Sequence, residues 1–395
     1  GNQTGQAGNA SSNAAAGNGG VALDLNAKVD NGSNAIKIDF QDAVTVTGGN
    51  GGVGTAQNSG NGAMAIDAHE FENVTINLHT TTQTASDVVF AGGNGATSLN
   101  SGTAGVTSNT GITVGTNAVI AVTETVDAVD ADGAALDKDD ASNINFNDIK
   151  GSNVTVDASA INGDVTIDSV EGNTSITTGA GNDTILAGTG IDTISLGAGN
   201  DIVNGQAGAD AINLGTGRDI VIVDFNSYAG TTESSTTAYD QITNFNLLAS
   251  SITSVDLSDN AKFQAAAVIG EADVLDLADA YTTPATIALT ADTSTAGSAI
   301  INSALVKWTV SDGLVTITEN ATAINSVAYV AALLDAAVGT TAGTTAAVEY
   351  AGSTYVFTEG GTYDTFVELV GLTGVSGLEV IGNATTETAG TLFIA

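Results

Sequence analysis

The chain has 395 residues, of which 44 are Asp or Glu and 7 are Lys or Arg, so its formal net charge is −37. This balance excludes a nucleic-acid binder and a protein held by anionic lipids, because both need a basic face. Hydrophobic residues make up 42% of the chain, which is enough for a folded core, and Cys is absent. No apolar run is long enough to span a bilayer, so we expect no membrane insertion. A divalent cation with oxygen ligands, calcium first, would relieve the repulsion among the carboxylates.

The N-terminal third of the sequence has the composition of a lead followed by strands. Residues 1–20 are mostly Gly, Asn, Ser and Ala and predict a flexible lead, without the basic start and apolar stretch of a secretory signal peptide. Across residues 21–143, runs such as AIKIDF and NVTINLHT place apolar side chains at every second position. This alternation predicts a β-rich region.

An acidic stretch near the end of that region is a candidate metal loop. Asp130, Asp132 and Asp139 match positions 3, 5 and 12 of a helix-loop-helix calcium loop, but Ala128 stands at position 1. Two interpretations stay open, a calcium loop between strands and a solvated acidic loop.

Residues 144–225 contain a nine-residue repeat, with five units running from GAGNDTILA at residue 179 to GTGRDIVIV at residue 215. Three columns hold in every unit. The third position is Gly181, Gly190, Gly199, Gly208 and Gly217; the fifth is Asp183, Asp192, Asp201, Asp210 and Asp219; the seventh is Ile185, Ile194, Val203, Ile212 and Val221.

The repeat predicts a right-handed parallel β-roll, in which two units form each turn and the seventh position points inward. Asp side chains two units apart then stack in two rows and share ions with turn carbonyls. The glycines whose backbone carbonyls are predicted to bind these ions are Gly179, Gly181, Gly188, Gly190, Gly197, Gly199, Gly208, Gly215 and Gly217. At least three calcium ions are expected, between Asp183 and Asp201, Asp201 and Asp219, and Asp192 and Asp210. A metal-free Gly-Asp β-helix is the alternative.

This block resembles the repeats-in-toxin (RTX) calcium-binding family, whose nonapeptide is the same motif. Residues 226–395 extend the resemblance. Residues 239–245 and 254–258 are similar to an RTX capping segment, and residues 352–357 and 366–372 to the terminal hairpin of type I secretion substrates. The resemblance implies a C-terminal export signal, ending in TLFIA, and folding outside the cell. Residues 325–337 predict a small packing helix, with Gly339 just past its end. The expected fold class is therefore all-β, with one short helix.

Catalytic patterns are weak in this sequence. His69 and Glu70 begin a zinc-protease motif, but Asn73 stands where the second His belongs, and His79 lies in an alternating run. We therefore expect no enzyme.

The composition resembles RTX-type bacterial surface-layer proteins. We expect a secreted structural protein that self-assembles through calcium, as a surface layer or matrix filament. The resemblance leaves attachment to a cell-surface polysaccharide open. The alternatives are a calcium-dependent adhesin or carbohydrate-binding module, for which Trp308 is the single Trp, and an extracellular enzyme with an unrecognised site.

Overall fold

A computed structural model describes most of residues 153–381, together with strand segments on both sides. The described ranges are 3–4, 23–24, 35–41, 44–47, 50, 66–68, 73–80, 87–91, 110–114, 119–126, 143–150, 153–170, 172–223, 235–247, 272–277, 288–289, 293–360, 364–381 and 391–394. The chain divides into two compact units, residues 1–189 and 190–395. The strand-dominated structure with parallel sheets confirms the predicted all-β roll.

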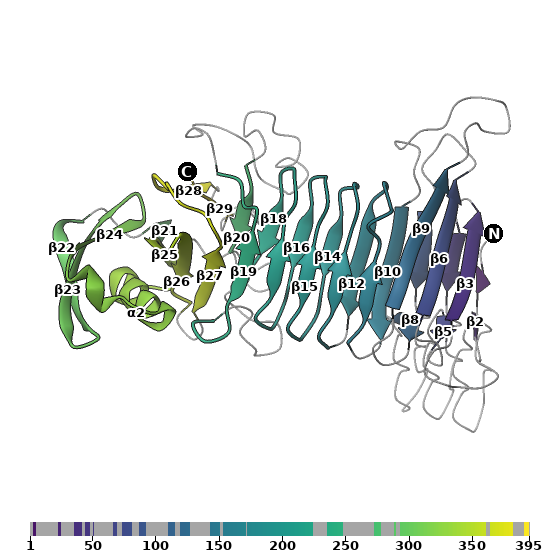
Figure 1. Cartoon of the computed structure of the whole chain (residues 1–395), viewed down its shortest axis with the longest axis horizontal. Helices are drawn as coiled ribbons and strands as arrows, with labels where there is room; N and C mark the ends of the chain where they lie inside the picture. Colours follow the sequence, from purple (N-terminus) through teal and green to yellow (C-terminus); the bar gives the residue numbers. More distant parts are fainter. Residues whose placement is uncertain are drawn as a thin grey trace, which may run out of the picture. The chain divides into compact units, whose positions relative to one another are not determined.

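The N-terminal unit is a stack of parallel strands (Figure 1). One ladder runs β1 (Gln3–Thr4), β4 (Val44–Thr47), β7 (Asp87–Ala91), β10 (Asn143–Lys150), β12 (Val165–Val170) and β14 (Thr184–Leu186). A second runs β3 (Ala35–Gln41), β6 (Asn73–Thr80), β9 (Val119–Val126), β11 (Thr155–Asp157) and β13 (Ser175–Thr177). A third, β2 (Leu23–Asp24), β5 (Ile66–Ala68) and β8 (Thr110–Val114), joins β10.

Inward-facing apolar side chains fill this stack. Val74 and Ile76 of β6 are at most 1% exposed, as the strand alternation predicts. Phe90 and Phe146 stack with ring centroids 5.2 Å apart. The strands therefore form a continuous parallel β-core.

The C-terminal unit begins with the short strands of the repeat. β15 (Thr193–Ser195), β17 (Ala211–Asn213) and β19 (Asp240–Thr243) form one parallel ladder. β16 (Ile202–Asn204), β18 (Ile220–Ile222) and β20 (Val274–Asp276) form the other. Within the repeat, paired residues are two nonapeptides apart, for example Ile194 with Ile212. This spacing is the predicted turn of the roll.

The rest of this unit is a longer-stranded sheet with a helix against it (Figure 1). β22 (Thr293–Ile301), β23 (Ala304–Ser311) and β24 (Leu314–Glu319) are antiparallel, and β24 runs parallel to β25 (Thr344–Tyr350). β25, β26 (Ser353–Thr358) and β27 (Thr365–Leu369) are antiparallel, and β27 pairs with β19. We call residues 293–369 the C-terminal sheet. β21 (Ala288–Leu289) pairs with β25, whereas β28 (Leu378–Ile381) and β29 (Thr391–Ile394) form a hairpin beside β20.

The helix α2 (Val327–Val338) confirms the predicted packing helix. Ser326 occupies the N-cap position, and the helix ends at Gly339, whose φ of 80° suits glycine. A 3-10 turn, Ala321–Ala323, precedes it. Val330, Leu333 and Leu334 are fully buried in a core that includes Trp308 and Phe366. The C-terminal sheet thus has a conventional apolar core.

Candidate calcium-binding site

The seventh repeat position forms the core of the repeat turns. Ile185, Ile194, Val203, Ile212 and Val221 are each at most 1% exposed. Each sits at the centre of a three-residue strand. The ninth-position side chains Ala187, Leu196, Leu214 and Val223 are buried as well, at most 2% exposed. This confirms the predicted inward face.

The fifth-position aspartates are also buried, none of them more than 1% exposed. Oδ1 atoms in these rows accept backbone N–H groups from the preceding turn. Val165 donates to Asp183 at 2.8 Å, Asp192 to Asp210 at 2.8 Å and Asp201 to Asp219 at 2.9 Å. Two of these bonds join aspartates of one row, so the structure stacks Asp192 with Asp210 and Asp201 with Asp219. The predicted neighbours Asp183 and Asp201 belong to different units, and their pairing stays a prediction.

Asp219 shows the electrostatic state of these carboxylates most clearly. Its side chain is 0% exposed, and its Oδ2 accepts no hydrogen bond from any described residue. Burial raises the pKa of Asp219 to about 7, the hydrogen bond from Asp201 opposes that rise, and the charge of Asp273 adds to it. The Oδ2 atom is buried in the four other repeat aspartates too. A buried carboxylate in these surroundings must either take up a proton or stay ionised beside a bound cation.

The glycines bring backbone carbonyls close to the turns. A Cβ on Gly181, Gly208 or Gly217 would collide with the carbonyl oxygen of the glycine one turn earlier in the roll. Gly217 also has a φ of +138°, whereas Gly181 and Gly208 lie outside that left-handed region. Close approach between turns therefore requires glycine even where φ does not. A Cβ on Gly208 would also lie 2.7 Å from Asp210 Oδ1, so this carboxylate folds back into its own turn.

The donor set fits calcium. At Gly208 the Gly190 carbonyl oxygen and the Asp210 Oδ1 atom lie close to the same point, and carbonyl and carboxylate oxygens are the hard ligands that calcium prefers. A family model for the RTX calcium-binding nonapeptide repeat matches residues 168–190 and 186–221. This part of the chain belongs to that family. RTX nonapeptide repeats bind calcium and are typical of secreted proteins. A search of curated proteins found no relative that matches the chain.

Gln206 stands at the first position of its repeat unit, where the RTX motif has Gly. Its φ is 62°, in the same left-handed half of conformational space as the first-position Gly188 and Gly215. The Gln206 N–H donates to Asn204 Oδ1 at 2.7 Å. A non-glycine residue therefore accepts the RTX turn geometry at a conformational cost.

Two buried aspartates outside the repeats make the same contacts. Asp240 Oδ1 accepts the N–H of Asp210 at 3.0 Å, and Asp273 Oδ1 accepts the N–H of Asp219 at 2.8 Å. Sequence reasoning places Asp240 in a capping segment and overlooks Asp273. The signal was the pattern Asp-x-Ile or Asp-x-Leu, which starts both segments as it does the repeat strands.

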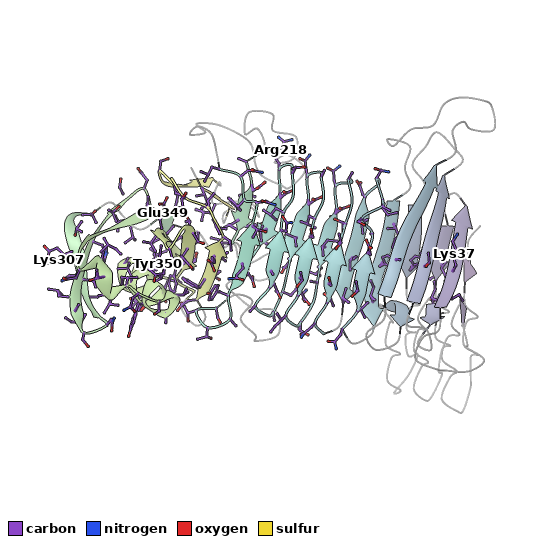
Figure 2. The ribbon with its side chains drawn as sticks, viewed as in Figure 1. Lys37, Arg218, Lys307, Glu349 and Tyr350 are labelled. Atoms are coloured by element: carbon purple, nitrogen blue, oxygen red, sulfur yellow. The ribbon has the colours of Figure 1, made fainter. Side chains whose placement is uncertain are left out.

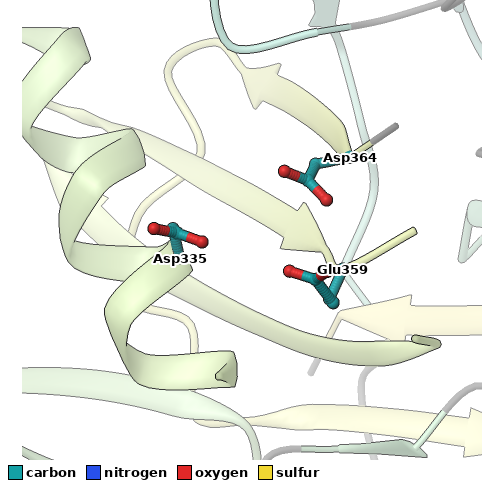
Figure 3. A group of neighbouring side chains, drawn as sticks. All are labelled: Asp335, Glu359 and Asp364. Carbon is teal, nitrogen blue, oxygen red and sulfur yellow. The ribbon is translucent and has the colours of Figure 1, made fainter. Parts of the chain in front are cut away.

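Three further carboxylates gather outside the roll (Figure 3). Oxygens of Asp335 on α2, Glu359 after β26 and Asp364 before β27 lie within 4.8 Å of one another. Burial, and then the charge of Asp364, raises the pKa of Asp335. The Gly360 N–H donates to Asp364 Oδ1 at 3.2 Å. These contacts make a repulsive acidic cluster, and by themselves they do not define a metal site.

The basic side chains of the C-terminal unit do not gather in its described part. Arg218 lies on a repeat turn and Lys307 on the C-terminal sheet, where its Nζ is 2.8 Å from Glu319 Oε1 (Figure 2). Among the described residues, no helix has the length and apolar character needed to cross a bilayer. Asp130, Asp132, Asp139 and His69 lie outside the described residues, and so does the segment 254–258.

Proposed function

We propose that this protein is a secreted, non-catalytic structural protein whose copies assemble outside the cell once calcium has ordered the roll. Calcium binding by the RTX repeats supports the ion dependence. The net charge of −37 supports the need for divalent ions, because carboxylates on neighbouring copies otherwise repel.

The observation that carries assembly is the edge strand β22. It ends its sheet, and no described strand pairs with its outer side. Ile300 of β22 and Leu305 of β23 are cross-strand partners, and they are 71% and 45% exposed. Edge strands with bare backbone groups and apolar side chains are templates for pairing with another chain.

A second copy of this chain is the partner that β22 fits best. Its nine residues, TSTAGSAII, include no charged side chain, although the chain as a whole is strongly acidic. Two copies that meet along this edge bring together strands that carry no carboxylate of their own. Soluble proteins commonly protect such edges with Lys, Pro or a short strand, and β22 uses none of these.

Electron microscopy and light scattering in millimolar calcium, and then in chelator, test the proposal. We expect ordered sheets or filaments that dissolve when calcium is removed. Ile300→Lys should prevent assembly, whereas the matched control Thr316→Lys, on an exposed position of the interior strand β24, should assemble normally. A wild-type protein that stays monomeric at high calcium overturns the proposal.

The adhesin alternative gains no support from the tryptophan. Trp308 is 3% exposed and packs where Gly297 leaves room for its ring, so it offers no face for a sugar. Glycan binding without self-association would favour that alternative.

A further inference from the structure

We propose that the calcium rows run one turn past the RTX repeats, with two more divalent-cation sites, one between Asp210 and Asp240 and one between Asp219 and Asp273. The family match ends at residue 221, before both new aspartates. This inference rests on calcium binding by the repeats and is independent of self-assembly.

Strand register places the new aspartates in the rows. β17 pairs with β19 so that Ala211 lies beside Gln241, which sets Asp240 beside Asp210. β18 pairs with β20 so that Ile220 lies beside Val274, which sets Asp273 beside Asp219. Both pairings are parallel, as within the repeats, so the new residues occupy the fifth position of a further turn.

The hydrogen bonds repeat the pattern of the rows. Inside the repeats, Asp210 Oδ1 accepts the Asp192 N–H and Asp219 Oδ1 accepts the Asp201 N–H. Asp240 and Asp273 accept the N–H groups of Asp210 and Asp219 at 3.0 Å and 2.8 Å. They are 3% and 0% exposed, which matches the burial of the repeat aspartates. Position, contact and burial therefore agree.

Two insertions hide this turn in the sequence. The hydrogen bond between Asp210 and Asp240 spans 30 positions and the one between Asp219 and Asp273 spans 54, whereas bonds within the repeat rows span 18. One insertion lies between Asp219 and Asp240, and the other lies between Asp240 and Asp273. The turn closes where the Asn246 N–H donates to Asp273 Oδ2 at 2.7 Å and the Asp273 N–H donates to the Asn246 carbonyl at 3.1 Å. Without the insertions, the two segments are one pair of nonapeptides.

The charge beside Asp273 points to a cation. Asp219 is fully buried, and its Oδ2 accepts no hydrogen bond from the described residues. Two neighbouring buried carboxylates cannot both stay ionised without a compensating positive charge. A calcium ion between Asp219 and Asp273 would neutralise both carboxylates and bind the Asp219 Oδ2 atom.

Calcium counting on full-length variants tests the two sites. We expect Asp273→Asn and Asp240→Asn each to lose one bound ion in equilibrium dialysis, and the double variant to lose two. The matched control Asp276→Asn, which lies in the same β20 segment and is only half-buried, should keep the wild-type number. A folded Asp273→Asn protein with an unchanged count overturns the site at Asp219.

A second measurement covers variants that fail to fold. Anomalous diffraction from wild-type crystals grown with calcium should give peaks between Asp219 and Asp273 and between Asp210 and Asp240. Peaks confined to the repeat aspartates overturn the inference. The ion count is also to be repeated on Ile300→Lys, so that loss of assembly and loss of an ion are read separately.

Discussion

Asp219 and Glu368 are two buried carboxylates of the same unit with opposite surroundings. Glu368, in the C-terminal sheet, accepts the hydroxyl of Tyr355 at 3.0 Å on Oε1 and the Gln241 Nε2 group at 2.9 Å on Oε2. Asp219, in a repeat turn, has one oxygen bonded to the Asp201 N–H and the other buried with no hydrogen bond from a described residue. Two side chains satisfy the Glu368 carboxylate, one from the C-terminal sheet and one from β19 of the roll, whereas the repeat turn leaves an oxygen for an ion.

The two regions also differ in their apolar cores. The C-terminal sheet packs Tyr355 against Phe366, with ring centroids 5.6 Å apart, and surrounds them with the leucines of α2. Each repeat unit buries a seventh-position Ile or Val and, in four of the five units, an apolar ninth-position side chain, but no aromatic ring. Because folding must offset the conformational entropy of the chain, the repeat needs the binding energy of calcium and the C-terminal sheet does not.

Removal of calcium should separate the two regions most strongly. Each ion stabilises the folded repeat by about 3 kcal/mol at a hundredfold excess over its Kd, so chelation should unfold the turns. The C-terminal sheet should persist. Far-UV circular dichroism should lose strand signal while the fluorescence of the single, buried Trp308 stays blue-shifted. Loss of both signals at one calcium concentration would contradict the separation.

The pH dependence of the calcium-free protein should be inverted relative to the calcium-bound one. Because the pKa of Asp219 is raised from 3.8 to about 7, its ionisation costs the folded state about 4 kcal/mol above pH 7. That cost disappears as the pH falls from 7 towards 4. Denaturation in chelator should therefore show greater stability at pH 5 than at pH 8.

With calcium bound, protons compete for the same carboxylates, so stability should fall over the same range. Parallel pH profiles with and without calcium would count against Asp219 as a ligand.

Much of this contrast is readable from the sequence, and the exceptions have physical causes. The period of nine predicts the turns, and the apolar spacing predicts a helix over 325–337, observed at Val327–Val338. The expected terminal hairpin corresponds to the antiparallel pairing of β26 with β27. The nine-residue pattern does not predict the positions of Asp240 and Asp273, because insertions before each of them break the period. The pairing of β27 with β19 joins distant segments, which no local pattern encodes.

Gly217→Ala should distinguish steric from conformational roles of glycine. The new Cβ would meet the Gly199 carbonyl oxygen at a φ of +138°, so we expect a loss of about 3 kcal/mol. Gly374→Ala, with a φ of +79° but open space around it, should cost about 1 kcal/mol. If both variants lower the melting temperature in calcium equally, the close approach between turns adds nothing to the cost of replacing Gly217.

Asp201→Asn and Asp210→Asn should weaken calcium-induced folding to a similar degree. The repeat spacing alone predicts a larger effect at Asp201, because Asp210 is then the last residue of its row. With Asp240 beyond it, Asp210 also has a neighbour on both sides. Calcium titrations followed by circular dichroism measure the difference between the two midpoints. A clearly milder Asp210→Asn variant would favour rows that end within the repeats.

Gln206→Gly should have the smallest effect and the opposite sign. Glycine relieves the left-handed conformation at φ 62° but loses more entropy on folding, so we expect a gain of up to about 1 kcal/mol. Thermal melting in saturating calcium measures it. A lower melting temperature would mean that the Gln206 side chain itself stabilises the turn.

The link between β19 and β27 sets an order of folding. Successive repeat turns close loops of 18 residues, whereas the hydrogen bond from Gln241 to Glu368 closes one of 127. Loop-closure entropy makes the longer closure about 2 kcal/mol less favourable before contacts compensate it. The repeat turns therefore form fast from local contacts, and the pairing of β27 with β19 is the slow step. Until that step is complete, β19 is the growing end of the roll, and its backbone is open to capture by another chain.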